Sequence, residues 1–145
     1  MKALKLEAET IQVSVYSDII LEILYTHKEL SINKILVFAY LIKKERFFPK
    51  KIYTAKNSQD IIYKCVSQIS GDFEGYCNSI EYILKAIHLL NTKKIVVVRD
   101  NWISLCAHKS VSETIYKESN FITKAIEASK CMTEKQFMKE VIHNV

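Results

Sequence analysis

The chain has 145 residues, of which 49% are hydrophobic and 26% are charged, and it contains only two glycines and one proline. This composition predicts one mostly helical domain, residues 1–145, and excludes a disordered or low-complexity chain. No apolar run reaches the roughly 18–20 residues that a membrane span requires, and residues 1–10 do not form a signal peptide, so we expect a cytoplasmic protein without a membrane partner.

The formal charge of +5 is unevenly distributed along the chain. Residues 31–57 contain seven Lys and Arg against one Glu, and residues 92–109 contain four against one Asp. The basic excess therefore lies in two segments. The acidic residues among the first thirty are interpreted as a solvated face.

The N-terminal part predicts a change from extended chain to helix. Ile11, Val13 and Val15 alternate with polar residues, which suits a short strand or an extended arm. Ser17 and Asp18 can then cap a helix that ends near His27. The apolar face of this helix would comprise Ile19, Ile20, Ile23 and Leu24.

A second helix is predicted from Ser31, its N-cap, to Lys43 and Lys44, whose charges suit a helix C-terminus. It is apolar almost all round, which places it in the centre of a bundle or under an interface. Its apolar residues are Ile32, Ile35, Leu36, Val37, Phe38, Ala39, Leu41 and Ile42.

The main irregular segment follows this helix, because Pro49 forces the preceding residue out of helical geometry. Either its two Phe side chains enter the core while the basic residues are solvated, or the segment binds a partner or phosphate. Aromatic and Arg side chains dominate protein–protein interfaces, which favours partner binding. The candidate partner-binding residues are Arg46, Phe47, Phe48, Lys50 and Lys51.

A third helix is predicted from Asn57 or Ser58 to Gly71, and a long fourth helix from Phe73 to Leu90. We expect the two apolar stripes to pack on each other, with Ile83, Leu84 and Ile87 buried against Ile61, Cys65 and Val66.

A β-hairpin is predicted directly after the long helix. Residues 95–98 are four β-branched side chains, residues 100–101 tolerate a tight turn, and residues 102–105 alternate as a returning strand. Helices followed by a hairpin are typical of a winged helix-turn-helix. The predicted fold is therefore mainly α with a small β-hairpin, in which residues 17–108 form a winged-helix-like core.

Residues 110–145 predict two further helices as a C-terminal extension. Ser110 and Glu113 form one capping box, and Thr133 and Gln136 form another. Each helix is apolar on one face. The two helices are therefore expected either to fold back on the core or to form a homodimer.

No motif for catalysis, metal binding or cofactor binding is present, and two glycines cannot supply a glycine-rich phosphate loop. Cys106 and His108 are too few for a zinc site. The four cysteines lack a CxxC pair and are expected to be buried free thiols. The sequence therefore predicts a non-enzymatic protein without a metal or cofactor.

Nucleic-acid binding is the alternative function, because winged helices place a recognition helix in the major groove and a wing near the backbone. The candidate contacts are Asn78, Lys85, Lys93, Lys94 and Arg99. Phosphate contacts need Lys and Arg, and the long helix offers little besides Lys85. Protein contact is therefore favoured over DNA binding.

Residues 37–49, an apolar helix with a basic end and a proline, resemble the middle components of bacterial ABC-three-component systems. So do residues 73–90 and the short ribbon of residues 94–105. The resemblance covers roughly residues 17–108. It implies a non-catalytic adaptor that bridges an ABC-type ATPase and an effector in a bacterial conflict system, whereas the alternative is a DNA-binding transcriptional regulator.

Overall fold

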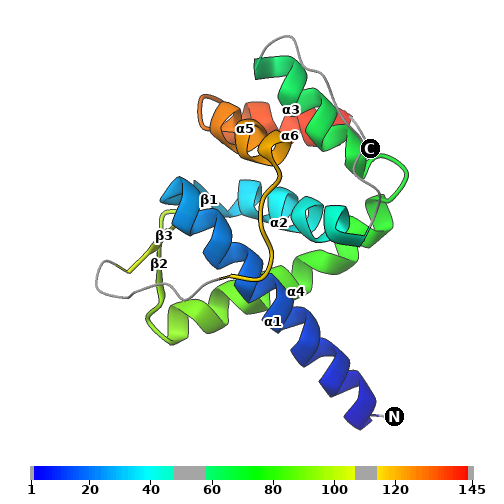
Figure 1. Cartoon of the computed structure of the whole chain (residues 1–145), viewed down its shortest axis with the longest axis vertical. Coiled ribbons are helices and arrows are strands. Elements are labelled where there is room, and N and C mark those ends of the chain that lie inside the picture. The colour runs from blue at the N-terminus through cyan, green and yellow to red at the C-terminus, as the bar shows by residue number, and fades with distance from the viewer. Residues whose placement is uncertain (1, 48–57, 107–113, 144–145) are drawn as a thin grey trace.

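The structure is a computed structural model that describes residues 2–47, 58–106 and 114–143 (Figure 1). The described part consists of helices and one three-stranded antiparallel sheet, which confirms the predicted mainly α fold with a small β-hairpin. The elements in chain order are α1 (Lys2–His27), β1 (Glu29–Ser31), α2 (Ile32–Phe47), α3 (Ser58–Val66), the 3-10 helix η1 (Ser67–Ile69), α4 (Phe73–Thr92), β2 (Val96–Arg99), β3 (Trp102–Leu105), α5 (Asn120–Ser129) and α6 (Glu134–His143).

Helix α2 lies at the centre of the molecule. Helices α1 and α4 and the sheet pack on one side of it, and α3, α5 and α6 form a second layer on the other side (Figure 1). Because α2 is enclosed from both sides, its side chains Ile35, Phe38 and Leu41 are fully buried. Of the two positions predicted for this apolar helix, the structure shows the centre of the bundle. The Ser31 hydroxyl accepts from the Lys34 amide, as its predicted capping role requires.

The elements α1, β1, α2, α4, β2 and β3 follow the order of a winged helix-turn-helix, with α3 inserted between α2 and α4. The sheet order is β1-β3-β2, and Leu30 of β1 pairs with Ile103 of β3. The predicted hairpin turn is confirmed, because Asp100 and Asn101 have φ angles of 48° and 68°, as a tight two-residue turn requires. Strand β1 was not predicted, since three residues are too few to show an alternating pattern.

The prediction of a strand or extended arm near residues 11–16 is wrong, because α1 is helical from Lys2. The predicted cap is also wrong. The Ser17 hydroxyl donates to the Val13 carbonyl inside the helix, and Asp18 accepts from backbone amides of residues 115 and 116. Residues 2–10 are rich in strong helix formers, and this propensity continues the helix through the alternating segment.

The predicted packing of α4 on α3 is wrong as well. Helix α4 packs mainly on α1 and also on α2, whereas α3 packs on α5. Ile83 and Ile87 are buried as predicted, but Leu84 is 44% exposed. The reason is topological: α3 turns away to the far side of α2, and Gly71, with φ of 87°, allows the chain to return before α4.

The two C-terminal helices fold back on the core, which is one of the two predicted arrangements. Their buried apolar residues are Ile122, Ala125, Ile126, Phe137 and Val141. The second capping box is confirmed, because the backbone N–H of Gln136 donates to the Thr133 hydroxyl and the backbone N–H of Thr133 donates to the side-chain oxygen of Gln136. The first one, residues 110–113, lies outside the described residues. The helix that was predicted to start there is α5, which begins at Asn120 and has Ser119 as its N-cap.

Candidate functional site

The outward face of α4, where a winged helix would contact DNA, contains two glutamates and only one lysine or arginine. Glu74, Asn78, Glu81, Lys85 and His88 are all exposed, and their spacing of three and four residues places them on one face. Asn78 and Lys85 are therefore accessible, as the nucleic-acid prediction requires. The Lys85 ammonium, however, forms an ion pair with Glu81 at 2.9 Å.

Lys85 has a second acidic partner on another element. Its ammonium also binds the carboxylate of Glu9, which extends from α1. The hydrogen bonds that the Lys85 ammonium donates to Glu9 and Glu81 raise the pKa of Lys85 above its ordinary value. A phosphate would have to compete with two carboxylates for Lys85, the only lysine or arginine among these five residues.

The remaining predicted nucleic-acid residues lie far from Asn78. Lys93 follows α4, fifteen residues beyond Asn78, which corresponds to about 22 Å at 1.5 Å per residue. Lys94 lies beside Lys93, and Arg99 lies at the opposite end of β2, roughly 10 Å of strand away. All three are exposed. The five predicted contacts are therefore spread along α4 and the hairpin, and their role in binding nucleic acid stays a prediction.

The hairpin does not project as a free wing. The amide of Ile32, the first residue of α2, donates to the Asn101 carbonyl at 2.8 Å, so the turn contacts the start of α2. Trp102 is 39% exposed, and the Lys34 ammonium lies 5.8 Å from the centre of its ring. A tight turn attached to the body leaves little freedom to follow a phosphate backbone.

The predicted partner-binding segment is mostly outside the described residues. Arg46 and Phe47 belong to the last turn of α2, and their side chains lie outside the described part. Phe48, Lys50 and Lys51 lie outside it entirely. The choice between a core loop and a partner-binding loop therefore stays a prediction.

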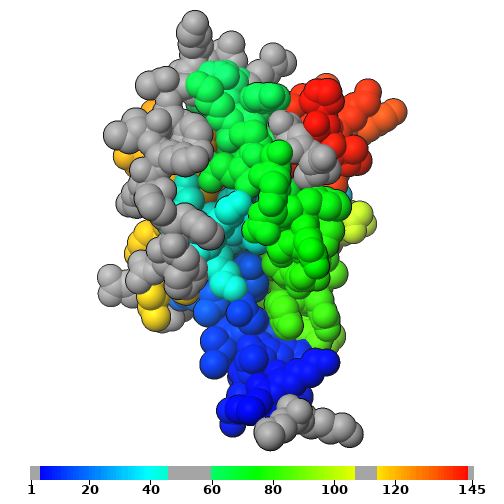
Figure 2. Space-filling view, turned by 90° about the vertical axis from the view of Figure 1, so that its right-hand side faces the viewer, coloured from blue at the N-terminus to red at the C-terminus, as the bar shows by residue number. Residues whose placement is uncertain are grey.

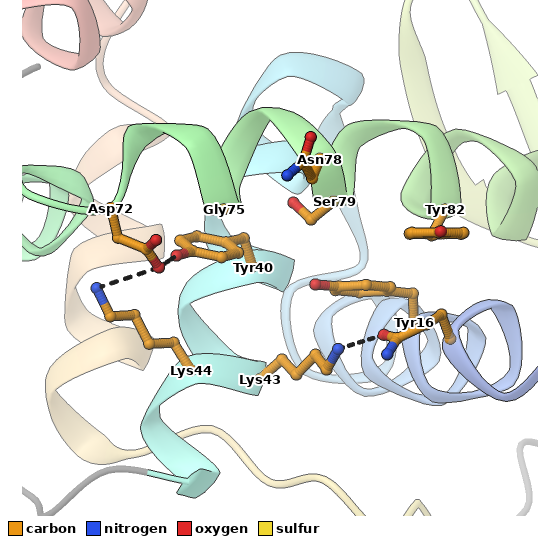
Figure 3. Close-up of a pocket in the computed structure, with 10 residues that line it drawn as sticks. Tyr16, Tyr40, Lys43, Lys44, Asp72, Gly75, Asn78, Ser79 and Tyr82 are labelled. Atoms are coloured by element: carbon orange, nitrogen blue, oxygen red, sulfur yellow. Dashed lines mark hydrogen bonds and ion pairs between the residues drawn. The ribbon is translucent and has the colours of Figure 1, made fainter. Parts of the chain in front are cut away.

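A pocket of about 280 Å³ lies between α1, α2 and the first half of α4 (Figure 3). It was not predicted from the sequence, because its residues come from three separate helices. It is lined by Gln12, Tyr16, Tyr40, Lys43, Lys44, Asp72, Gly75, Asn78, Ser79 and Tyr82. Among the described residues, Asn78 is the only predicted site residue that lines this pocket.

Asp72, Tyr40 and Lys44 form a polar cluster at one end of the pocket. The Tyr40 hydroxyl donates to the Asp72 carboxylate, and the Lys44 ammonium lies 3.9 Å from the same carboxylate oxygen. Burial and the bond to Asp72 both raise the pKa of Tyr40. The absence of a side chain at Gly75 leaves room for the Asp72 carboxylate, because a Cβ at that position would lie 2.5 Å from an Asp72 oxygen.

Lys43 and Tyr16 form the other side of the pocket. The Lys43 ammonium donates to the Gln12 side-chain oxygen and lies 5.1 Å from the centre of the Tyr16 ring. Burial lowers the pKa of Lys43 and raises the pKa of Tyr16 to about 12. Among the described residues, no carboxylate pairs with Lys43. The pocket therefore offers one ammonium without an acidic partner.

A second polar arrangement attaches residues 114–118 to α1. Asp18 accepts from the amides of residues 115 and 116, and Glu22 accepts from the Thr114 hydroxyl. Glu22 is 8% exposed, so the interpretation of the early acids as a solvated face is wrong for these two residues. Their spacing of four on one helix was the available signal.

A buried histidine at the end of α1 also contacts this part of the chain. His27 is 1% exposed; its Nε2 lies 2.8 Å from Glu118 and its Nδ1 lies 2.5 Å from Glu127. Burial opposes protonation, but the bonds to the two carboxylates outweigh it and raise the pKa of His27. Both ring nitrogens of His27 face a carboxylate, an arrangement that favours the protonated ring and connects the end of α1 with Glu118 and with Glu127 of α5.

The remaining sequence predictions concern the cysteine thiols, metal binding and membrane spans. Cys65 is buried, and burial raises the pKa of its thiol. Cys77 and Cys131 are exposed and Cys106 is half-buried, so of the four thiols expected to be buried only Cys65 is. In residues 2–47, 58–106 and 114–143, no group of three His, Cys, Asp or Glu could hold a metal ion. None of the helices in these ranges has the length and apolarity needed to cross a membrane.

Comparison with known proteins does not assign the chain to a family. No protein-family model, curated protein or solved structure matches it.

Proposed function

We propose that this chain is a non-catalytic adaptor subunit that bridges an ABC-type ATPase and an effector in a cytoplasmic bacterial conflict system. The observation that supports it best is the outward face of α4, where Glu74 and Glu81 outnumber Lys85. A helix that reads DNA needs the opposite charge, whereas a protein partner does not.

The first turns of α1 offer one surface for such a partner. They stand clear of the body at the end opposite to α3 and α6 (Figure 2). Leu4 and Ile11 are 63% and 61% exposed, and the spacing of Leu4, Ala8 and Ile11 places them on one helix face. Exposed apolar side chains grouped in this way are typical of protein contact sites.

The end of α2 and the basic residues after it offer the second surface predicted from the sequence. If Arg46 and Phe47 contact a partner, changing both to Ala should abolish complex formation and leave the melting temperature unchanged. Size-exclusion chromatography of the variant mixed with the ATPase and the effector measures complex formation, and a thermal melt of the variant measures its melting temperature. A variant that still binds but melts several degrees lower would show that the two side chains belong to the core.

A duplex-DNA titration distinguishes the adaptor from a transcriptional regulator. The adaptor should bind duplexes without sequence preference, with a dissociation constant of about 10⁻⁴–10⁻⁶ M at physiological salt. Fluorescence anisotropy against a set of promoter fragments provides the measurement.

The opposite result would have a recognisable signature. A nanomolar, sequence-dependent complex would favour the regulator. Replacing Lys93, Lys94 and Arg99 with Ala should then reduce the slope of log affinity against log salt by roughly three units.

A further inference from the structure

Helix α4 exposes a line of apolar side chains, which we name the α4 stripe: Phe73, Cys77, Ile80 and Leu84. Phe73 and Leu84 are 47% and 44% exposed, Cys77 is exposed and Ile80 is half-buried. Figure 2 shows the green surface of α4 on the outside of the molecule. Exposed apolar side chains that are grouped in this way indicate a contact with another molecule.

The α4 stripe has the spacing of a coiled-coil seam. Its members are separated by four, three and four positions, which places them in one line along about 16 Å of helix. Such a seam suits another helix, because each side chain can enter a gap between side chains of the facing helix. The spacing therefore favours a helical partner over an extended one.

Charges beside the α4 stripe restrict the chemistry of that helix. Glu74 and Glu81 flank it on the solvent side, at heptad positions whose charges set partner choice. The equivalent positions on the other side, Tyr76 and Ile83, are buried in the core. Helix α4 contains no Lys or Arg before Lys85. A partner helix with basic residues beside its apolar line is therefore favoured.

The wider group of charges around the stripe is also acidic. Two lysines act on Glu81: Lys85 at 2.9 Å, and Lys5 of α1 through its charge. Together with Glu9, which binds Lys85, and Glu74, they give three negative and two positive charges, a net of −1. A second copy of this chain would bring its own glutamates to the contact, and like charges at flanking positions oppose pairing. Duplex DNA is disfavoured for the same reason.

We propose that the α4 stripe binds an amphipathic helix of a protein partner, with Lys or Arg residues of that helix beside Glu74 and Glu81. The proposal deepens the adaptor function and rests on it, because the helix would belong to one of the two bridged proteins. It adds a third surface to those at the start of α1 and the end of α2.

Titration with three synthetic peptides tests the proposal. The lysine peptide repeats a heptad with Leu at a and d and Lys at e and g, and its lysines repel each other across a self-pair. In nitrogen-15 amide spectra it should produce saturable shifts at Cys77, Ile80 and Leu84, with a dissociation constant on the order of 0.1 mM or below. A glutamate peptide, with Glu at e and g, should bind roughly tenfold more weakly or worse. A peptide with Lys at e and g but Ala at a and d should give no saturable shift, because the apolar contact is lost.

Leu84→Gln removes the apolar contact at one end of the α4 stripe and retains a good helix former. It should weaken binding of the lysine peptide by roughly tenfold or more, because central apolar anchors dominate such contacts. Ile142→Gln is the matched control. Ile142 is 68% exposed on α6, in the other layer, so its replacement should leave the affinity unchanged.

Exchanging the flanking charges tests the chemistry of the partner. A chain with Glu74→Lys and Glu81→Lys should bind the glutamate peptide more tightly than the lysine peptide. The proposal is overturned if the lysine peptide gives no saturable shift at the α4 stripe, if Leu84→Gln binds as the unmodified chain does, or if the double variant still prefers the lysine peptide. A failed titration would overturn this docking site alone, because co-expression with the neighbouring gene products detects a complex formed through any surface.

Discussion

Replacing Phe137 with Ala is expected to lower the free energy of unfolding by about 3–5 kcal/mol. Phe137 is fully buried on α6, and its ring centre lies 5.6 Å from that of Phe38 on α2. Because α2 is the central helix, the lost contact would open a cavity between the two layers. Chemical denaturation followed by circular dichroism measures the change.

Ile142→Ala on the same helix is the matched control. Ile142 is 68% exposed, so its truncation should change the free energy of unfolding by less than about 0.5 kcal/mol. If Phe137→Ala cost less than about 1 kcal/mol, α6 would not be part of the cooperative core, and the two-layer description would fail.

Replacing Glu118 with Gln is expected to destabilise the fold by about 3 kcal/mol, the lower end of the cost of breaking a buried ion pair. The Glu118 side chain is 3% exposed and lies 2.8 Å from Nε2 of the buried His27, whose protonated form it favours. The cost stays at the lower end because His27 can release its proton when its partner is lost. Denaturant titration near neutral pH measures this loss.

The same cluster predicts how stability depends on pH. The pKa of His27 is raised in the folded chain, so its contribution is complete below pH 6.5, the ordinary value, and is lost as the pH rises through the raised value. The hydrogen bond from His27 lowers the pKa of Glu127, so that contribution is present above pH 4.5 and is lost as the pH falls. The cluster should stabilise most between these two values.

Denaturation curves between about pH 6 and about pH 9 test this dependence. The free energy of unfolding should fall with rising pH, and the fall should be smaller in Glu118→Gln. The control His88→Gln changes an exposed histidine and should retain the full fall. Equal pH profiles for the unmodified chain and Glu118→Gln would contradict the proposed pairing of His27.

Local signals in the sequence predicted local structure well. The capping box of Thr133 and Gln136 and the turn at Asp100 and Asn101 each depend on residues a few positions apart. Gly71 follows the 3-10 helix η1, which ends at Ile69, whereas α3 itself ends earlier than predicted, at Val66. Backbone conformation at such sites is determined by nearby side chains. The same signals failed at Ser17, where a cap pattern lies inside a longer helix.

Contacts between distant segments could not be predicted from spacing. His27 and Glu118 are separated by 91 positions, and Lys43 meets Gln12 across 31. Both pairs require the path of the chain around α2, which periodicity does not determine. For the same reason, the stripes of α3 and α4 were predicted to face each other although α2 lies between their layers.

The most direct test of the adaptor function is the composition of the complex formed when the tagged chain is expressed with the products of its neighbouring genes. Size exclusion with light scattering and mass spectrometry should find one particle that contains the chain, an ABC-type ATPase and the effector. A chain that elutes without either protein would contradict the proposed function.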